Sequence, residues 1–321
     1  MLQQYDADTG KLGLALRSHI NFKCAAYSPN GSQIATASME GEVRLWNAQS
    51  CVVEHVIQTK EPVSILAYSP CGRWIALRLE TGGVKVWDAR SESSQHICLD
   101  RPPVNSLAFS PNGLNLAVGY RNGDIRVWET STWICKMVIK GIINLVACVV
   151  YPPKSSYLAC YYVAGAKGIR LFDEKGEPFQ TILEHEKIKS EKFTYSSCGQ
   201  WIAAADGQKV DLWTYTSNGI KTGWAHATTV KGFFGNVEKV TWRPNATEFA
   251  TASQDGSIRA WKVEKESGNV SVQLLWGYGG TVLTTLGAVL VGSVGLTNTN
   301  QKLLQQRGAI FESSSSANNS A

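Results

Sequence analysis

Residues 109–128 read FSPNGLNLAVGYRNGDIRVW and hold two turns and two short apolar segments within 20 positions. Pro, Asn and Gly supply the fixed or positive φ that tight turns need, and they occur at both turn positions. Between the turns the chain runs apolar, and after the second turn it alternates into an aromatic residue, Trp128. The stretch therefore predicts antiparallel strands joined by tight turns.

The pattern recurs along the chain at a period near forty residues. Its aromatic anchors are Tyr5, Trp46, Trp87, Trp128, Phe172, Trp213 and Trp261, with spacings of 41, 41, 41, 44, 41 and 48. Each repeat predicts one small antiparallel sheet. From residue 2 to about residue 296 the chain resembles the WD-repeat β-propeller family, which implies an all-β fold of four-stranded blades around a central channel. Seven anchors then predict a seven-bladed β-propeller.

The resemblance also implies a hydrogen-bonded set of His, Ser or Thr, Asp and Trp within a blade. A full match is His226, Ser253, Asp255 and Trp261, and a partial match is His19, Ser38 and Trp46, with Glu40 where Asp is usual. Trp87 with Asp88, Trp128 and Trp213 are the corresponding structural residues of other repeats. We interpret all of these as structural, because buried polar groups need partners and this set provides them.

The two ends of the chain suggest how the propeller closes. Leu2–Tyr5 and Lys11–Leu16 read as third and fourth strands, whereas Thr281–Leu286 and Ala288–Val291 read as two further strands near the other end. We expect a closing blade built from both termini, which would leave no open sheet edge. A membrane helix over Val282–Leu296 is the competing interpretation, but 15 residues fall short of the ~20 that a bilayer span needs.

Composition excludes several kinds of function. The eight Cys form no CxxC pair and have no His at ligand spacing, so we expect no metal, no other cofactor and no disulfide framework. Motifs for phosphate binding, serine hydrolysis and zinc proteolysis are absent, which indicates a protein that is not an enzyme and has no small-molecule substrate. The net charge is +5 and the Lys residues do not cluster, which disfavours nucleic acid. No secretory leader opens the chain, and Cys71 and Cys198 occupy turn positions, so we expect a cytoplasmic protein.

Recognition of a protein or peptide is the remaining function. The interval between Trp213 and Trp261 exceeds the usual spacing by seven residues, and we place this excess between strands Gly219–Trp224 and Val237–Trp242. Phe233 and Phe234, beside Lys231, are the candidate anchors there, although they could instead fold back into the channel or over a neighbouring blade. Further candidates on the same channel-mouth face are Arg78, Glu80, Tyr120, Arg121, Tyr161, Tyr162 and Gln254.

The C-terminal segment adds a second resemblance. Residues 295–309, GLTNTNQKLLQQRGA, are similar to the ending of propellers in fungal NACHT and WD-repeat proteins. We expect a propeller over 1–296, a short docking helix within 297–311 and a disordered Ser/Asn-rich tail over 312–321. The sequence thus predicts a non-catalytic scaffold or sensor. The alternatives are a nucleic-acid-associated adaptor and the recognition module of a larger NACHT-type NTPase whose NTPase domain is absent from this chain.

Overall fold

The structure is a computed structural model, and its described part consists of strands, turns and loops. It describes residues 2–16, 21–98, 103–141, 146–153, 155, 157–162, 168–184, 193–217, 222–244, 247–266, 269–278, 289–291 and 310–312. Within these ranges no helix is long and apolar enough to cross a membrane. The chain divides into two compact units, which are described separately below.

The first unit comprises Met1–Tyr5 and Leu12–Glu191 and contains four four-stranded antiparallel sheets. Blade 1 consists of β3 (Phe22–Tyr27), β4 (Gln33–Ser38), β5 (Glu42–Asn47) and β6 (Val53–Gln58). Blade 2 consists of β7 (Val63–Tyr68), β8 (Trp74–Leu79), β9 (Val84–Asp88) and β10 (Ser93–Cys98). Blade 3 consists of β11 (Val104–Phe109), β12 (Asn115–Tyr120), β13 (Ile125–Glu129) and β14 (Cys135–Ile139). Blade 4 consists of β15 (Val146–Val150), β16 (Leu158–Tyr162), β17 (Gly168–Phe172) and β18 (Pro178–Glu184).

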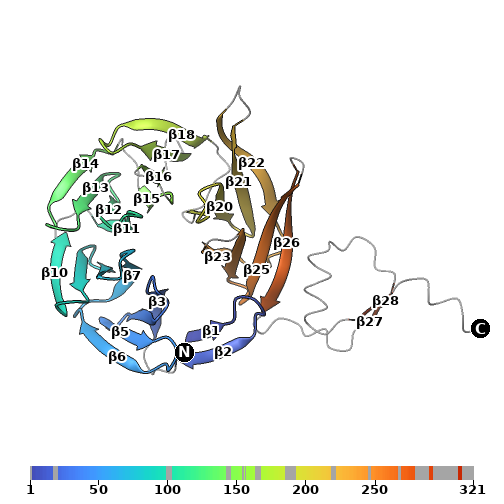
Figure 1. Cartoon of the computed structure of the whole chain (residues 1–321), viewed down its shortest axis with the longest axis horizontal. Helices are drawn as coiled ribbons and strands as arrows, with labels where there is room; N and C mark the ends of the chain where they lie inside the picture. The colour runs from blue at the N-terminus through green and yellow to red at the C-terminus, as the bar shows by residue number, and fades with distance from the viewer. Residues whose placement is uncertain are drawn as a thin grey trace, which may run out of the picture. The chain divides into compact units, whose positions relative to one another are not determined.

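The second unit comprises Asp6–Lys11 and Lys192–Ala321 and contains two more such sheets. Blade 5 consists of β19 (Phe193–Tyr195), β20 (Trp201–Asp206), β21 (Lys209–Ser217) and β22 (Thr222–Val230). Blade 6 consists of β23 (Val237–Trp242), β24 (Glu248–Ser253), β25 (Ile258–Glu266) and β26 (Asn269–Tyr278). Figure 1 labels most of these strands, and their order along the chain is their order across each sheet.

The repeated turn between the first two strands of a blade has the same hydrogen bonds in different copies. In blade 3 the Ser110 hydroxyl accepts the Asn115 N–H (2.9 Å), and the Gly113 N–H donates to the Ser110 carbonyl (2.8 Å). The same two bonds join Ser28 to Gln33 and to Gly31 in blade 1. Gly113 has φ of 73°, a conformation that residues with a Cβ rarely adopt. The sequence period therefore corresponds to a structural repeat.

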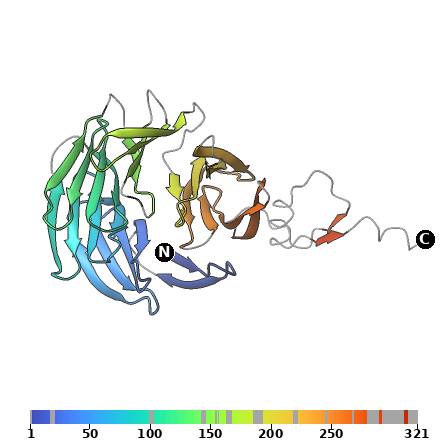
Figure 2. The ribbon, with the colours of Figure 1, turned by 45° about the horizontal axis from the view of Figure 1, so that its top comes forward.

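The hydrophobic core lies between neighbouring blades. One cluster joins Leu45 of blade 1 to Val63 and Leu77 of blade 2, and each of these side chains is at most 1% exposed. Equivalent clusters join blade 2 to blade 3, blade 3 to blade 4, and blade 5 to blade 6. In Figures 1 and 2 the four sheets of the first unit, coloured blue to yellow-green, lie side by side. Each blade therefore depends on its neighbour for burial of its apolar faces.

The indole partners of the anchor tryptophans differ from the prediction. Trp46 Nε1 donates to the Thr36 hydroxyl (2.8 Å), and Trp261 Nε1 donates to the Thr251 hydroxyl (3.0 Å). The predicted partners Ser38 and Ser253 lie two positions further along the same Ala-Thr-Ala-Ser segments. Residues two apart point to the same face of a strand, so the sequence identified the correct face and the wrong hydroxyl.

The other anchors are held mainly by apolar packing. Trp87, Phe172 and Trp213 are 5%, 4% and 6% exposed. Within the described residues the buried Nε1 of Trp128 has no hydrogen-bond partner, and Val118 occupies the position that Thr36 occupies in blade 1. These blades therefore lack the Thr–Trp hydrogen bond because the Thr is missing.

The N-terminal hairpin supplies part of a seventh blade. β1 (Leu2–Tyr5) pairs with β2 (Leu12–Leu16) in a two-stranded antiparallel sheet, and Leu16 is fully buried in a cluster with Trp46 of blade 1. Its turn belongs to the second unit, where Trp276 Nε1 donates to the Ala7 carbonyl (2.8 Å). The predicted fold class, a seven-bladed β-propeller of four-stranded antiparallel blades, is confirmed.

The strands expected to complete the seventh blade have a different arrangement. β27 (Val289–Val291) pairs in parallel with β28 (Ile310–Glu312), and in the described part of the chain it has no pairing with β1 or β2. Thr281–Leu286 lies outside the described residues. Residues 310–312 were not predicted to form a strand that pairs with β27. Residues 310 and 311 belonged to the predicted docking helix, whose remaining residues, 297–309, are not described and stay a prediction.

Candidate functional site

The loop before β23, Lys231–Asn236, is fixed to blade 6 by hydrogen bonds along its length. The Phe234 N–H donates to the Asp255 carboxylate (3.0 Å), and Arg259 Nη1 donates to the Gly232 carbonyl (2.7 Å). At Gly235 an added Cβ would lie 2.6 Å from the Asp255 backbone nitrogen, so only glycine fits there. We call this segment the 231–236 loop, and its backbone is held from both the strand and the turn of blade 6.

The two phenylalanines of this loop have opposite environments. Phe233 is 5% exposed, its ring centroid is 5.8 Å from that of Trp261, and the Arg259 guanidinium lies 4.6 Å from its centroid. Phe234 is 72% exposed. Phe233 as an exposed anchor is therefore wrong, because its ring completes the apolar core between blades 5 and 6. Phe234 remains a candidate.

A buried ion pair supports the loop from below. Asp255 Oδ2 lies 3.3 Å from Arg259 Nη2, and their side chains are 5% and 0% exposed. Burial by itself raises the pKa of Asp255, but hydrogen bonds from Ser257 and from the Phe234 amide, together with the charge of Arg259, lower this pKa below its ordinary value. Asp255 is therefore an anion in the folded protein and compensates the buried guanidinium.

His226 does not join the predicted set with Ser253, Asp255 and Trp261. It lies on β22 directly opposite Trp213, with ring centroids 5.7 Å apart, and its side chain is 50% exposed. Its Nε2 lies 3.2 Å from the Thr229 hydroxyl and 3.5 Å from an Asp211 carboxylate oxygen. β22 is the last strand of blade 5, and there the local Thr and Asp are closer partners than the groups of blade 6. His19 lies outside the described residues.

Three of the predicted interaction residues in the first unit are core residues. Tyr120, Tyr161 and Tyr162 are 1%, 2% and 6% exposed. They end the second strands of blades 3 and 4, where side chains pack between sheets and do not project from the turns. The guanidinium of Arg126 lies 5.1 Å from the Tyr120 ring centroid. These tyrosines are therefore unsuited to contact a partner in this conformation.

Arg78 is half-buried and has a structural role. Its Nε donates to the Val104 carbonyl (2.6 Å) and its Nη1 to the Ser64 hydroxyl (2.7 Å), which links blade 2 to blade 3. Burial lowers the pKa of its guanidinium, and the nearby charge of Arg121 lowers it further, against the opposing effect of Glu80. Glu80 and Arg121 themselves are exposed.

Lys231 and Gln254 are exposed beside Phe234 in the second unit. The Gln254 N–H donates to the Asn236 carbonyl (2.8 Å), and its side-chain amide donates to Glu238 (2.6 Å). The structure therefore brings Phe234, Lys231 and Gln254 together on one loop and its adjoining turn. Glu80 and Arg121 form a separate group in the first unit. Among the described residues no group of three or more His, Cys, Asp or Glu could hold a metal ion.

The supporting role of Arg259 was missed from the sequence. A signal was present, because the position two residues before the anchor is basic in most repeats, as at Arg44, Lys85, Arg126 and Arg170. The predicted insertion was also misplaced. β6 ends 12 residues after Trp46, whereas β22 ends 17 residues after Trp213, so most of the excess lengthens the β21–β22 hairpin. The loop itself gains only two residues over the loop at 59–62.

Comparison with known proteins agrees with this architecture. The family model described as "WD domain, G-beta repeat" matches residues 10–47, 93–129 and 225–262. Similar solved structures include the WD40 repeats of RRP9 (TM-score 0.65, 17% identity, 80% of this chain and 81% of that chain). The β-propeller domain of Myceliophteria thermophila Cps50 (Swd1) is also similar, with a TM-score of 0.66 and 18% identity over 81% of this chain and 89% of that chain. The chain therefore contains WD repeats and has the fold of a β-propeller.

A curated relative is similar over a shorter range. The probable cytosolic iron-sulfur protein assembly protein 1 of Chaetomium globosum is 27% identical over 124 residues, which cover 32% of this chain. The match spans only 27% of that relative's length. At these levels of identity the similarity establishes repeats and fold.

Proposed function

We propose that this propeller is a non-catalytic scaffold or sensor that binds a protein or peptide partner at the 231–236 loop. Phe234 would be the anchor, with Lys231 and Gln254 beside it. WD-repeat propellers typically bind protein partners and are generally not catalytic, which supports this class of function. The exposed thiols of Cys71 and Cys198 suit a reducing compartment, so we also propose a cytoplasmic location.

The observation that carries the proposal is an exposed aromatic ring on an ordered backbone. Phe234 is 72% exposed while its own N–H is bound to a buried carboxylate. A side chain on a backbone that is already held in place loses less conformational freedom on binding than one on a mobile loop, so more of its burial free energy contributes to affinity. Aromatic residues placed in this way are often the energetic centre of an interface.

Site-specific photo-crosslinking tests the proposal. A photoreactive phenylalanine analogue would replace Phe234 in one variant and Tyr215 in a matched control, since Tyr215 is also exposed (46%) but lies on β21. After irradiation in an extract of the source organism, we expect a protein crosslinked from position 234 and absent from position 215. Equal products from both positions would contradict a specific site.

The same experiment separates the alternatives. A crosslinked nucleic acid, with binding that falls steeply as salt rises, would favour a nucleic-acid-associated adaptor. Immunoblotting of the source with an antibody against the propeller tests the remaining alternative. A polypeptide far larger than 35.0 kDa would favour the recognition module of a NACHT-type NTPase.

A further inference from the structure

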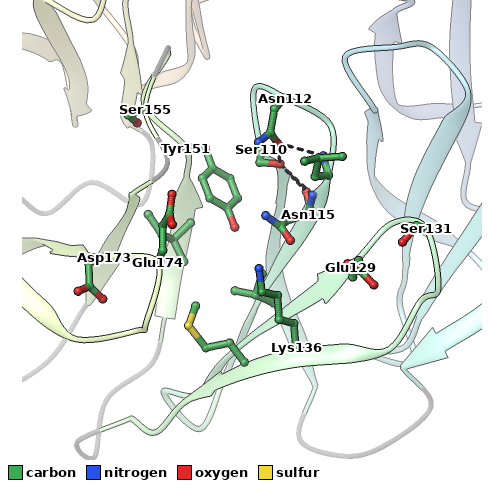
Figure 3. A pocket seen from close by; sticks show the side chains of 14 residues that line it. Ser110, Asn112, Asn115, Glu129, Ser131, Lys136, Tyr151, Ser155, Asp173 and Glu174 are labelled. Carbon is green, nitrogen blue, oxygen red and sulfur yellow. Dashed lines mark hydrogen bonds between the residues drawn. The ribbon is translucent and has the colours of Figure 1, made fainter.

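A small cleft lined by polar and apolar side chains lies between blades 3 and 4 of the first unit. It has a volume of about 260 Å³, below the roughly 300–1,000 Å³ of pockets that hold drug-sized ligands. Figure 3 shows Lys136 of blade 3 between Glu129 of the same blade and Tyr151 and Glu174 of blade 4, with Asp173 farther to the side. A space of this size suits a single side chain.

The corresponding position in blade 2 already binds a guanidinium that belongs to the chain itself. Arg73 donates to both carboxylate oxygens of Asp88, at 3.2 Å from Nε to each and 2.8 Å from Nη2 to Oδ2. The same guanidinium lies 4.4 Å from the ring centroid of Trp74. The hydrogen bonds from Arg73 lower the pKa of Asp88, although its burial opposes the shift. This place in the repeat therefore accommodates an arginine head group.

Strand register makes Glu129 of blade 3 the equivalent of Asp88. Asp88 pairs with Trp74, as Glu129 pairs with Asn115. Arg73 directly precedes Trp74, and its carbonyl accepts the N–H of the residue after Asp88. Leu114 directly precedes Asn115, and its carbonyl accepts the N–H of the residue after Glu129, so Leu114 is the equivalent of Arg73. Leu114 cannot donate a hydrogen bond, and its side chain is 60% exposed on the wall of the cleft.

In blade 1 the polar side chains at the equivalent position bind one another. There Glu54 accepts hydrogen bonds from the side chains of Gln33 (2.5 Å) and Asn47 (3.0 Å), and Asn47 is the equivalent of Glu129. Those polar groups satisfy one another. In blade 3 the Thr132 hydroxyl donates to one carboxylate oxygen of Glu129 (2.8 Å), and Glu129 lines the cleft.

The charge of the cleft favours a cation. Glu129, Asp173 and Glu174 contribute three carboxylates against the single amine of Lys136. Met137 also lines the cleft and offers an apolar surface for the methylene stem of a long side chain. A planar guanidinium can donate two hydrogen bonds to a single carboxylate, which a neutral amide or a short side chain matches less well.

We propose that this cleft binds an arginine side chain from an extended segment of a protein partner. The guanidinium pairs with Glu129, in the way that Arg73 pairs with Asp88, the blade 4 carboxylates favour its positive charge, and the stem packs on Met137 and Leu114. No residue of the 231–236 loop takes part. The inference therefore stands or fails independently of the function proposed above.

Methyl NMR provides a direct test, because the chain contains only three methionines. Met137 lines the cleft, whereas Met39 lies in a turn of blade 1, 46% exposed, and acts as the internal control. With methyl-labelled methionine, we expect the peptide acetyl-Gly-Arg-Gly-amide to shift the Met137 signal saturably and to leave Met39 unchanged. The isosteric citrulline peptide, which lacks the positive charge, should cause no shift.

Three variants sharpen the result. Glu129→Gln should weaken arginine binding about fivefold, whereas Lys136→Gln, which removes the competing cation, should strengthen it. Leu114→Arg rebuilds the internal pair of blade 2 and should abolish the shift. Glu40→Gln, an exposed change in blade 1, is the matched control. Equal shifts with the arginine and citrulline peptides, or unchanged binding in Glu129→Gln and Leu114→Arg, would overturn the proposal.

Discussion

Two loops that join successive blades, 59–62 before β7 and 231–236 before β23, are both held by backbone hydrogen bonds to turns of the two blades that they join, the first at both ends and the second at its end before β23. In the first, Thr59 N–H donates to the Gly41 carbonyl (2.8 Å) and Glu80 N–H to the Pro62 carbonyl (2.9 Å). In the second, Val237 N–H donates to the Gly207 carbonyl (2.8 Å) and Gln254 N–H to the Asn236 carbonyl (2.8 Å). Each loop therefore connects the turns of two adjacent blades through backbone bonds.

The interiors of the two loops differ. In the shorter loop the Thr59 hydroxyl bonds the carbonyls of Gly41 (2.8 Å) and Glu61 (2.7 Å), and no large apolar side chain projects. The longer loop is supported by the buried Arg259–Asp255 pair and exposes Phe234. In the longer loop, buried groups of blade 6 bind the backbone around the two extra residues, whereas the shorter loop needs only its own Thr59 hydroxyl.

Removal of the buried guanidinium should have the largest effect. Arg259→Ala leaves the Asp255 carboxylate buried without its countercharge and frees the Gly232 carbonyl, so we expect the free energy of unfolding to fall by about 3–5 kcal/mol. Arg44→Ala is the matched control, because Arg44 holds the same repeat position in blade 1 but its side chain is 26% exposed and pairs with Glu42. We expect the control to cost below about 1 kcal/mol. Urea denaturation followed by tryptophan fluorescence measures both, and equal losses would refute the support role of Arg259.

Substitution of the two phenylalanines should change stability by different amounts in the same denaturation assay. Phe233→Ala removes a ring that is 5% exposed and should cost about 3 kcal/mol of stability. Phe234→Ala removes a ring that is 72% exposed and should change stability by no more than about 0.5 kcal/mol. If the Phe234 variant proves as unstable as the Phe233 variant, both rings are core residues and the loop offers no anchor.

Blades 1 and 6 both contain the Thr–Trp hydrogen bond, and its removal should lower stability by the same amount in each. Thr36→Val and Thr251→Val both keep the side-chain volume and remove the acceptor of a buried indole N–H, at a cost of about 1–2 kcal/mol. Val118→Thr offers a hydroxyl to Trp128 at the same repeat position and should stabilise blade 3 or leave it unchanged. Thermal denaturation measures the change in stability of each of the three variants. A neutral Thr251→Val would show that apolar packing alone holds the anchor.

The stability that the buried Asp255–Arg259 pair contributes should depend on pH, and this is the smallest of the expected effects. Because the folded pKa of Asp255 lies below its ordinary value of 3.8, its charged form stabilises the folded state above that pH. This contribution is lost as pH falls from 3.8 through the lower folded pKa. The stability difference between wild type and Asp255→Asn should therefore shrink in acid, as measured by denaturation at several pH values. A constant difference would mean that the carboxylate charge is not what stabilises the loop.

The repeat structure could be read from the sequence because it rests on local chemistry. Gly113 and its counterparts need positive φ, and the anchors recur at a fixed period, so turns, strands and blade number followed. The direction in which side chains point at strand ends was harder to predict. Tyr120 and Phe233 face the core while Arg121 and Phe234 face solvent, and since adjacent residues exchange faces, an offset of one residue reverses the interpretation.

Long-range features could not be read at all from one sequence. The end of β22, by contrast, left a local signal that the prediction missed, because Thr228, Thr229 and Val230 favour a strand and no turn residue precedes Gly232. The cleft between blades 3 and 4 depends on which side chains fill the equivalent space in blades 1 and 2, and this appears only once the register is known. Pairing of β27 with β28 likewise joins residues far apart in the chain.

The affinity of the crosslinked partner for the Phe234→Ala variant tests the central claim most directly. Isothermal titration with the wild-type propeller, Phe234→Ala and the control Tyr215→Ala would give three dissociation constants at one salt concentration. We predict a loss of about tenfold or more for Phe234→Ala, with its melting temperature and the control's affinity unchanged. An unaltered affinity in Phe234→Ala would contradict the account and place the partner elsewhere on the propeller.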